Sequence, residues 1–498
     1  MLKVNISKTW NTSVLVITIA LLLSLSGYVL FDPIKSANIL ANLYASVAKK
    51  FELSFLYIGF LILIFLITLA LSPFGKFKIV LPNKSVYSFI SWSSMLFATG
   101  MGAALLYWAT IEWIYYYNDP LDNLNSYNKL LLARSYPLFH WTFTGWAIYC
   151  LPAVAFGLAL YLRPNAPLTF SGILISKNSS ILSRALSRAL DVFFIGAILS
   201  GAGVGLGLSF PLISSVFANI FNVEKSFTLD LIALFVCLII FGTSVFLGLD
   251  NGIKRLSNFN VFLLLIFLIL IFLLGPTQYI INNTIDSVVY LSQNYLSWSL
   301  NSGTKYSLDW TVFYWAWYLA LAPAIGTFII NISNNKTIRQ IILGTILIGS
   351  LGCFLNITIM TNLSTYLYES NLLNSPEILK EGLMKPEILI IESIVLLPYG
   401  EYFLMLFGVI LIIFLCTTYD SASYILASAS MNKSKYEPSR FLRVIFAITL
   451  VVQPGLIMFM GGTESFKWIL VIFSIPLLIV NLFLILSIFK NAYSIRKT

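Results

Sequence analysis

Long apolar stretches separated by short polar segments recur along the whole chain. Most contain about 20 residues, the length that an α-helix needs to cross the hydrocarbon core of a bilayer. This pattern predicts an all-α polytopic membrane protein with about twelve transmembrane helices and no separate soluble domain. The predicted spans are residues 13–31, 54–73, 88–114, 139–162, 190–220, 228–248, 259–283, 309–332, 338–360, 402–430, 440–461 and 466–489.

The composition agrees with a membrane location. Of the 498 residues, 59% are hydrophobic and only 10% are charged, whereas soluble domains average about 25% charged residues. The net charge of +10 would suit a nucleic-acid-binding protein if the chain were soluble, but the basic residues fall in alternate loops. We therefore expect the lipid bilayer, and no nucleic acid, as a partner. The four cysteines lie within spans and are interpreted as small core residues.

Basic residues predict the orientation, because cytoplasmic loops of membrane proteins carry an excess of Lys and Arg. These residues follow the even-numbered predicted spans, and acids are common in the opposite loops. Both termini are therefore expected in the cytoplasm, and the protein is expected in the inner, or plasma, membrane. The basic residues include Lys76, Lys78, Lys84, Arg163, Lys177, Arg184, Arg188, Lys254, Arg255, Lys336, Arg339, Lys433, Lys435, Lys490, Arg496 and Lys497.

Two spans contain residues that weaken a continuous helix. Residues 98–103 read Ala-Thr-Gly-Met-Gly-Ala, and residues 323–326 read Pro-Ala-Ile-Gly. The two spans are five apart and so cross in opposite directions. Interrupted helices in corresponding positions of two inverted halves indicate the binding site of a secondary transporter. Close helix packing is the favoured explanation of one glycine alone, but the pair of breaks at this offset favours interruption of both helices.

Aromatic residues crowd two predicted spans, at residues 140–149 and 310–318. Lipid-facing Trp and Tyr normally lie near the headgroups, whereas these lie mid-span. At 100° per residue, Trp141, Trp146 and Tyr149 fall within an arc of about 140° on one helix face. Aromatic ring faces suit a cation without hydrogen-bond donors, such as a quaternary ammonium. Ordinary packing is the alternative in a chain that is 15% aromatic.

Several motifs are similar to motifs of one family and occur in the same order along the chain. Because of these motifs, nearly the full chain resembles the betaine/choline/carnitine transporter family. The motifs are Gly100-Met101-Gly102 followed by Tyr107-Trp108 and Glu112, Phe139-His140-Trp141 with Trp146-Ala147-Ile148-Tyr149, Gly248-Leu249-Asp250-Asn251-Gly252-Ile253-Lys254-Arg255-Leu256-Ser257-Asn258, and Trp310-Thr311-Val312-Phe313-Tyr314-Trp315-Ala316-Trp317.

The resemblance implies a LeuT-like core of two inverted five-helix repeats, preceded by two extra helices, and a homotrimer. Residues 375–396, which mix Glu and Lys with Ile and Leu, are expected to form an external amphipathic helix. The expected divisions are 1–87 for the N-terminus and first two helices, 88–283 for the first repeat, 284–308 for an interfacial helix and loop, 309–489 for the second repeat and 490–498 for a short cytoplasmic tail.

The resemblance also implies a small-molecule onium substrate, of the glycine betaine, choline, carnitine or dimethylsulfoniopropionate type. Tyr318 stands where the family usually has the second Trp of a pair, and Leu321 stands where many members have another Trp. These departures leave the choice of substrate open. The implied substrate-binding residues are Trp141, Trp146, Tyr149, Trp317, Tyr318 and, by analogy with carnitine-type members, Tyr115.

A sodium ion is the expected coupling ion, and no other cofactor is expected. Thr417 and Thr418 are adjacent hydroxyls where sodium-coupled members use a hydroxyl pair. The matching carbonyls are those of Ala98, Met101 and Phe414. Hydroxyls bonded back to carbonyls one turn earlier are the alternative.

Four further positions bear on the coupling. The two that match a second sodium site hold Ile198 and Ala202, which have no side-chain oxygen. One sodium ion is therefore expected rather than two. Sodium-independent exchangers of the family carry an Arg and a Met where this chain has Asn260 and Ile325. This favours symport, with exchange of carnitine- or betaine-like compounds as the alternative.

Two ionisable residues leave alternatives open. Asp420 lies in or near the inner leaflet, where it could tune the ion site or gate, or pair with a basic loop residue. For His140, the only histidine, a hydrogen-bonded structural role is favoured over proton coupling. A membrane enzyme would need a partnered base, nucleophile or metal cluster. The sequence offers no such grouping, so a transporter and not an enzyme is expected.

Overall fold

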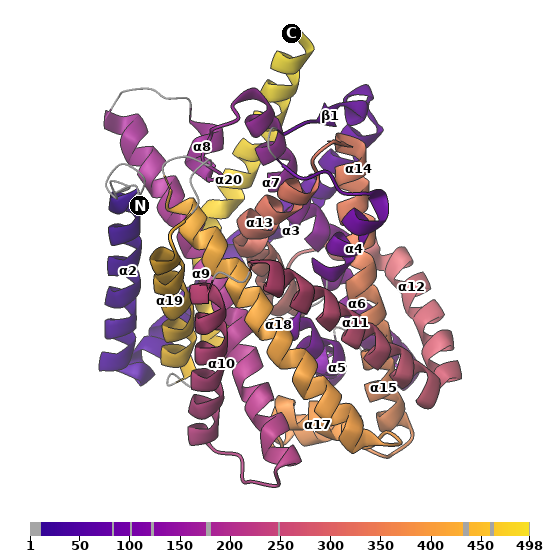
Figure 1. The fold of residues 1–498 in the computed structure, drawn as a ribbon. Coiled ribbons are helices and arrows are strands. Elements are labelled where there is room, and N and C mark those ends of the chain that lie inside the picture. The colour runs from indigo at the N-terminus through magenta and orange to yellow at the C-terminus, as the bar shows by residue number, and fades with distance from the viewer. Residues whose placement is uncertain are drawn as a thin grey trace.

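Helices form nearly all of the regular structure of the protein (Figure 1). The apolar stretches favour helices because a helix satisfies its own backbone hydrogen bonds, which a bilayer cannot do. The structure is a computed structural model. It describes residues 11–81, 84–99, 102–120, 124–175, 181–247, 250–431, 438–458 and 463–497.

The first half of the chain forms the helices up to α12. They are α2 (Thr12–Phe31), α3 (Pro33–Leu71), α4 (Phe89–Thr99), α5 (Ala103–Asn118), α6 (Ser126–Trp141), α7 (Phe143–Leu162), α8 (Phe170–Leu174), α9 (Ile181–Ile220), α10 (Phe227–Leu247), α11 (Asp250–Leu274) and α12 (Thr277–Leu300). The second half forms α13 (Val312–Ile332), α14 (Ile338–Leu343), α15 (Ser350–Glu369), α16 (Ser375–Lys380), α17 (Pro386–Val395), α18 (Gly400–Ala429), α19 (Arg440–Met458) and α20 (Thr463–Lys497). Short elements are η1 (Pro73–Lys76), η2 (Ser307–Thr311), η3 (Gly344–Gly349), β1 (Lys78–Ile79) and β2 (Lys336–Thr337).

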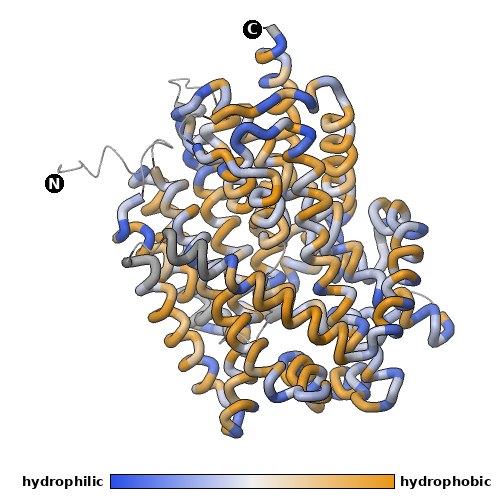
Figure 2. Tube along the Cα trace, turned by 45° about the vertical axis from the view of Figure 1, so that its right-hand side comes forward, coloured by the Kyte–Doolittle hydropathy of each residue, from blue (hydrophilic) through white to orange (hydrophobic). Residues whose placement is uncertain are grey.

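The helices have the length and composition of membrane spans. Among the described residues, eight helices are long and apolar enough to cross a membrane, or nine if the bent pair α4–α5 counts as one span. Hydrophobic residues run along the helices, and hydrophilic residues gather in the loops at the two ends of the bundle (Figure 2). The predicted all-α polytopic membrane fold is confirmed.

Two basic loops lie at the same end of the bundle. β1 follows α3, β2 follows α13, and the two strands pair in antiparallel fashion, with Lys78 opposite Thr337. Arg339 donates from Nε to the carbonyl of Ala70 at 2.7 Å. In Figure 1, β1 and the end of α20 both lie at the upper end of the bundle. This arrangement fits the predicted grouping of basic loops on one side, and the cytoplasmic assignment of that side stays a prediction.

The third predicted span is broken, as the sequence indicates. α4 ends at Thr99, α5 begins at Ala103, and the two helices are bent by 56°. Gly100 and Met101 lie outside the described residues. The break sets α5 on a separate axis, along which Tyr107, Trp108 and Glu112 are placed in the core.

The predicted interruption of the eighth span is wrong. α13 runs continuously from Val312 to Ile332, with Pro323 inside it. Gly326 serves close packing instead, because a β-carbon there would lie 2.8 Å from the ring of Pro152 and 2.9 Å from the backbone nitrogen of Ala153. The glycine therefore lets α13 approach α7.

Two predicted boundaries also differ from the structure. α11 ends at Leu274 and α12 begins after Pro276, so the expected division near residue 284 falls inside α12. Proline lacks the N–H that a continuing helix needs, which explains the change of element. Residues 375–396 form two helices, α16 and α17, rather than one. Gly382, with φ +67°, turns the chain between them.

α13 lies near the middle of the bundle (Figure 1) and packs against α3, α7, α9 and α20. α5 packs against α6, α9 and α15. α6 in turn packs against α7. Side chains from α5, α6, α7 and α13 consequently meet in the interior, where the aromatic segments of the sequence converge.

Candidate functional site

One buried carboxyl group lies at the centre of the bundle. Glu112 of α5 is completely buried. Its Oε2 accepts hydrogen bonds from the indole N–H of Trp141 at 2.8 Å and the hydroxyl of Tyr314 at 2.7 Å. Its Oε1 accepts one from the hydroxyl of Tyr116 at 2.7 Å and lies 3.0 Å from Nδ1 of His140. A buried carboxylate needs such donors because they replace its lost water.

His140 is hydrogen-bonded through both ring nitrogens. A carboxylate oxygen can only accept, so Nδ1–H donates to Glu112. Nε2 lies 3.1 Å from the hydroxyl of Thr311, and the imidazole stacks on Tyr314 with 4.3 Å between the ring centroids. His140 is fully buried. Its hydrogen bonds fit the structural role that the sequence favours over proton coupling.

Four of the predicted substrate-binding residues lie in contact with one another beside this carboxyl group. The ring centroids of Trp141 and Trp317 are 6.1 Å apart, and those of Trp141 and Tyr318 are 6.4 Å apart. Tyr149 contacts Tyr318 at 4.8 Å. We call these four residues, Trp141, Tyr149, Trp317 and Tyr318, the aromatic cage. They come from α6, α7 and α13 and are all buried.

The rings of the aromatic cage pack directly on one another in this conformation. Separations of about 4.5–7 Å are typical of contacting aromatic pairs, so the rings support one another. Two anchors position them. The indole N–H of Trp317 donates to the carbonyl of Gly201 at 2.9 Å. Tyr318 lies flush against α7, where a β-carbon on Gly145 would be 2.3 Å from its Cζ atom.

The other two predicted residues lie at the edges of the aromatic cage. Trp146 contacts Tyr149 at 5.7 Å and is otherwise directed to η3, where a β-carbon on Gly349 would be 2.2 Å from its ring. Tyr115 contacts Trp310 at 5.0 Å. It belongs to a second group of rings, made of Tyr115, Trp108 and Trp310, beside η2, which precedes α13.

The single helix assumed for Trp141, Trp146 and Tyr149 is wrong. α6 ends at Trp141, and α7 begins at Phe143. Thr142, with φ −110° and ψ −136°, separates the two helices. The arc of about 140°, which assumes one continuous helix, therefore does not apply across the junction between α6 and α7. Trp141 and Tyr149 both contact Tyr318 of α13, whereas Trp146 contacts Tyr149 and extends toward η3.

The residues expected to hold sodium are only partly described. The hydroxyl of Thr417 donates to the carbonyl of Ile413 at 2.9 Å, one turn earlier, as in the alternative interpretation. Thr418 is exposed, which departs from the dry hydroxyl pair that was expected, because consecutive helical residues point about 100° apart. Phe414 is buried and Ala98 is half-buried near the end of α4. Met101 lies outside the described residues.

The positions matching a second sodium site lie in the core of α9. Ile198 and Ala202 are buried. The carbonyl of Ala202 accepts a hydrogen bond from the hydroxyl of Tyr419 at 3.0 Å. Leu321 lies over Gly201, where a β-carbon would be 2.9 Å from its Cγ atom. This stretch of α9 therefore supports α13 and α18 through small residues and carbonyls.

Comparison with known families decides the identity of the chain. A family profile described as "BCCT, betaine/carnitine/choline family transporter" matches residues 13–497. The chain belongs to this family. It is therefore a multi-pass membrane transporter and not an enzyme, and the family resemblance of the sequence motifs is confirmed.

Named members of the BCCT family align over most of their length. A carnitine transporter of Acinetobacter baumannii is 26% identical over 92% of this chain and 84% of its own length. An ectoine/hydroxyectoine transporter of Virgibacillus pantothenticus is 27% identical over 93% and 94%. The glycine betaine transporter OpuD of Bacillus subtilis is 25% identical over 98% and 95%.

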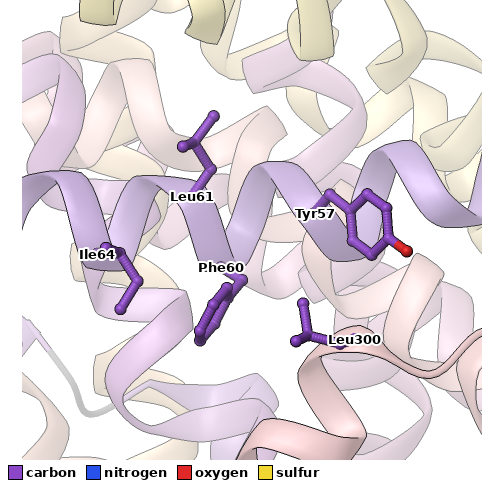
Figure 3. A pocket seen from close by; sticks show the side chains of 5 residues that line it. All are labelled: Tyr57, Phe60, Leu61, Ile64 and Leu300. Atoms are coloured by element: carbon purple, nitrogen blue, oxygen red, sulfur yellow. The ribbon is translucent and has the colours of Figure 1, made fainter.

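A cavity on the outside of this BCCT protein differs in character from the aromatic cage. Tyr57, Phe60, Leu61 and Ile64 of α3 surround it, with Leu300 at the end of α12 (Figure 3). Its volume is about 290 Å³. The lining is almost entirely apolar, whereas the aromatic cage adjoins the buried carboxyl group of Glu112.

The sequence alone predicts no role for Glu112, although this residue links the BCCT motifs. A signal was present, since an acid inside an apolar span is costly and usually functional. Its donors come from positions 4 to 202 residues away in the chain. The hydrogen bonds therefore become visible only once α5, α6 and α13 are assembled.

Replacing Gly145 with alanine is expected to weaken onium binding about tenfold or more. The added methyl group would overlap the Tyr318 ring, so the ring must move, and overpacking of this kind costs about 1–3 kcal/mol. Affinity is measured by calorimetric titration of the purified protein. Gly27→Ala is the matched control, since a β-carbon there meets nothing within 4 Å. Equal affinities in both variants would contradict the tight contact.

Proposed function

We propose that the protein is a secondary active transporter that imports an onium compound of the glycine betaine, choline, carnitine or dimethylsulfoniopropionate type, coupled to sodium. It works in the plasma membrane as a homotrimer, with both termini in the cytoplasm. One observation carries the proposal: the aromatic cage lies against a buried carboxyl group.

The chemistry of an onium head group matches this arrangement. A methylated ammonium has no N–H to donate, so ring faces are its best partners, and a desolvated cation–π contact contributes about 2 kcal/mol or more. Glu112 accepts the indole N–H of Trp141. A hydrogen bond to an anion increases the electron density of the indole and so strengthens its attraction for a cation.

The named relatives support the same class of substrate. Carnitine and glycine betaine, after which two of them are named, are quaternary ammonium compounds. Identities of 25–27% leave the individual substrate open. The departures at Tyr318 and Leu321 lie in or beside the aromatic cage, where they would tune its size.

The second part of the proposal is that sodium drives the transport. Asn260 is buried, and its side-chain N–H donates to the carbonyl of Ile410 at 3.1 Å. It carries no charge, so it supplies no substitute for a sodium ion, and neither does the aliphatic Ile325. Sodium-independent exchange is the alternative function. Thr417 offers a hydroxyl beside the carbonyls of Ile413 and Phe414 on α18.

Uptake into proteoliposomes tests the proposal. We expect saturable uptake of at least one radiolabelled compound among glycine betaine, choline, carnitine and dimethylsulfoniopropionate, and an increase of about tenfold or more under an inward sodium gradient. Sodium can drive such accumulation because its gradient and the membrane potential act on a charge that moves with the substrate. Uptake in the absence of sodium by liposomes that are preloaded with the substrate provides the comparison.

The outcomes separate the two functions. Undiminished uptake without sodium, with acceleration by substrate inside the liposomes, would support exchange and contradict symport. Failure to transport any of the four compounds would contradict the onium assignment itself.

A further inference from the structure

One asparagine in the interior is buried without hydrogen bonds. Asn356 of α15 is completely buried. Within the part of the chain that the structure describes, neither its Oδ1 nor its Nδ2 atom has a hydrogen-bond partner. Burying an amide in this way costs free energy that an apolar side chain of similar size would not cost. A polar group that enters the interior with a ligand would remove this cost.

The amide of Asn356 differs from those of other helical asparagines. Several of them donate an amide N–H to the carbonyl one turn earlier in their own helix, which satisfies the donor locally. Asn356 also stands within a helix, yet it makes no such bond to any described residue. Its amide is therefore left available to a neighbouring group. The asparagines that do bond back are Asn283, Asn294, Asn362 and Asn481.

Asn356 lies on the face of α15 that is turned toward the aromatic cage. Gly349, directly before α15, lies against the indole ring that contacts Tyr149. Cys353, one turn later, interacts electrostatically with both Tyr149 and Tyr318 of the aromatic cage. Asn356 follows Gly349 by seven residues and Cys353 by three. At about 100° and 1.5 Å per residue, these spacings place Asn356 on the same face, about 4.5 Å beyond Cys353.

The chemistry of an amide suits a hydroxyl group of the substrate. An amide presents both a donor and an acceptor, whereas a carboxylate can only accept and a quaternary ammonium can do neither. A hydroxyl group donates and accepts, so it can pair with either atom of the amide. Choline and carnitine both carry a hydroxyl on the second carbon from the ammonium nitrogen. A head group bound by the aromatic cage would therefore hold this hydroxyl close to the rings.

We propose that Asn356 binds this hydroxyl group and makes the protein selective for hydroxylated onium compounds, such as choline and carnitine, over compounds that lack the hydroxyl. The inference rests on the proposed function and narrows its substrate class, because glycine betaine and dimethylsulfoniopropionate have no hydroxyl group. A ligand without it leaves the amide of Asn356 unpaired in the complex. Sites that hydrogen-bond a substrate hydroxyl discriminate against such ligands for this reason.

Two pairs of ligands that differ only in the hydroxyl group test the inference. Carnitine is compared with γ-butyrobetaine, and choline with ethyltrimethylammonium, by calorimetric titration of the purified full-length protein. The two members of a pair have the same net charge, so the ratio of their affinities reports the hydroxyl alone. In the unchanged protein we expect the hydroxylated member to bind about tenfold more tightly or better. In Asn356→Leu and Asn356→Ala this preference should disappear.

Thermal unfolding without ligand separates binding from a structural role. Because Asn356 makes no hydrogen bond to the described residues, Asn356→Leu should keep or raise the thermal stability. Asn362 of the same helix provides the matched control. It donates to the hydroxyl of Thr284 on α12 at 3.2 Å and to the carbonyl of Thr358 at 2.8 Å. Asn362→Leu should therefore lower the thermal stability and leave both affinity ratios unchanged.

Several results would overturn the inference. Unchanged ratios in both Asn356 variants would exclude recognition of the hydroxyl by this amide and would leave a buried water molecule as its partner. An equal loss of affinity for both members of each pair would show that Asn356 acts through packing alone. If the unchanged protein binds onium compounds without preferring the hydroxylated members, the inference fails and the proposed function stands. If it binds no onium compound, both fail, so the two failures are distinguishable.

Discussion

Replacing Glu112 with alanine is expected to abolish onium binding and to lower the thermal stability of the protein substantially. The substitution leaves an indole N–H, two hydroxyls and an imidazole N–H without their shared acceptor in the interior. Each buried polar group left unsatisfied costs about 1–3 kcal/mol, although the costs are not additive. Trp141 and Tyr314 also lose the hydrogen bonds that position their rings. We therefore expect the aromatic cage to lose its arrangement.

Replacing Glu112 with glutamine separates the charge from the hydrogen bonds. The amide oxygen can take the place of Oε2, where the indole of Trp141 can only donate. The amide N–H groups then face Tyr116 and His140, which can both become acceptors, the imidazole by changing its tautomer and donating from Nε2 to Thr311. Glu112→Gln should therefore fold, yet bind a cationic head group about tenfold more weakly.

Thermal unfolding and calorimetric titration of both variants check this prediction. Glu401→Gln, which neutralises an exposed carboxylate at the start of α18, is the control and should change neither quantity. Full affinity in Glu112→Gln would show that the negative charge contributes nothing to binding. Full stability in Glu112→Ala would contradict the role of the carboxyl group as the acceptor that holds the three helices together.

The membrane helices could be predicted from the sequence because each depends on a local property. A run of about 20 apolar residues implies a span whatever surrounds it. The breaks were harder, since glycine and proline have more than one structural use. The third predicted span is bent between Thr99 and Ala103, whereas Pro323 lies within α13, and Gly326 gives α7 room to approach. Nothing local distinguishes the two cases.

The candidate site could be predicted in its residue types but not in its arrangement. The motifs indicate which rings are involved, yet the separation of α6 from α7 at Thr142 sends Trp146 toward η3 and leaves Trp141 beside Glu112. The contact of Lys467 with Trp310 could not be predicted either, because it joins residues far apart in the chain.

Replacing either Trp141 or Trp317 with leucine is expected to weaken onium binding about thirtyfold. Each indole would supply a desolvated cation–π contact of about 2 kcal/mol, and this energy corresponds to about a thirtyfold change in affinity. Leucine keeps the site apolar but offers no ring face. The variants should also lose the hydrogen bonds to Glu112 and to Gly201, respectively.

Phenylalanine at the same positions distinguishes the ring from its N–H group. Trp141→Phe keeps a ring face but cannot donate to Glu112, so its affinity should lie between those of the unchanged protein and Trp141→Leu. Trp298→Leu is the matched control. Trp298 belongs to α12 and contacts Tyr136 and Phe139 rather than the aromatic cage.

Calorimetry is the suitable measurement, because removing tryptophans alters the intrinsic fluorescence that would otherwise report binding. Each variant is titrated with the onium compound that the unchanged protein binds most tightly, after thermal unfolding has shown that it is folded. Trp298→Leu should bind like the unchanged protein, since its ring lies outside the aromatic cage. Unchanged affinity in both Trp141→Leu and Trp317→Leu would rule out the aromatic cage as the onium site, because each variant lacks one of the ring faces that the cation–π contacts require.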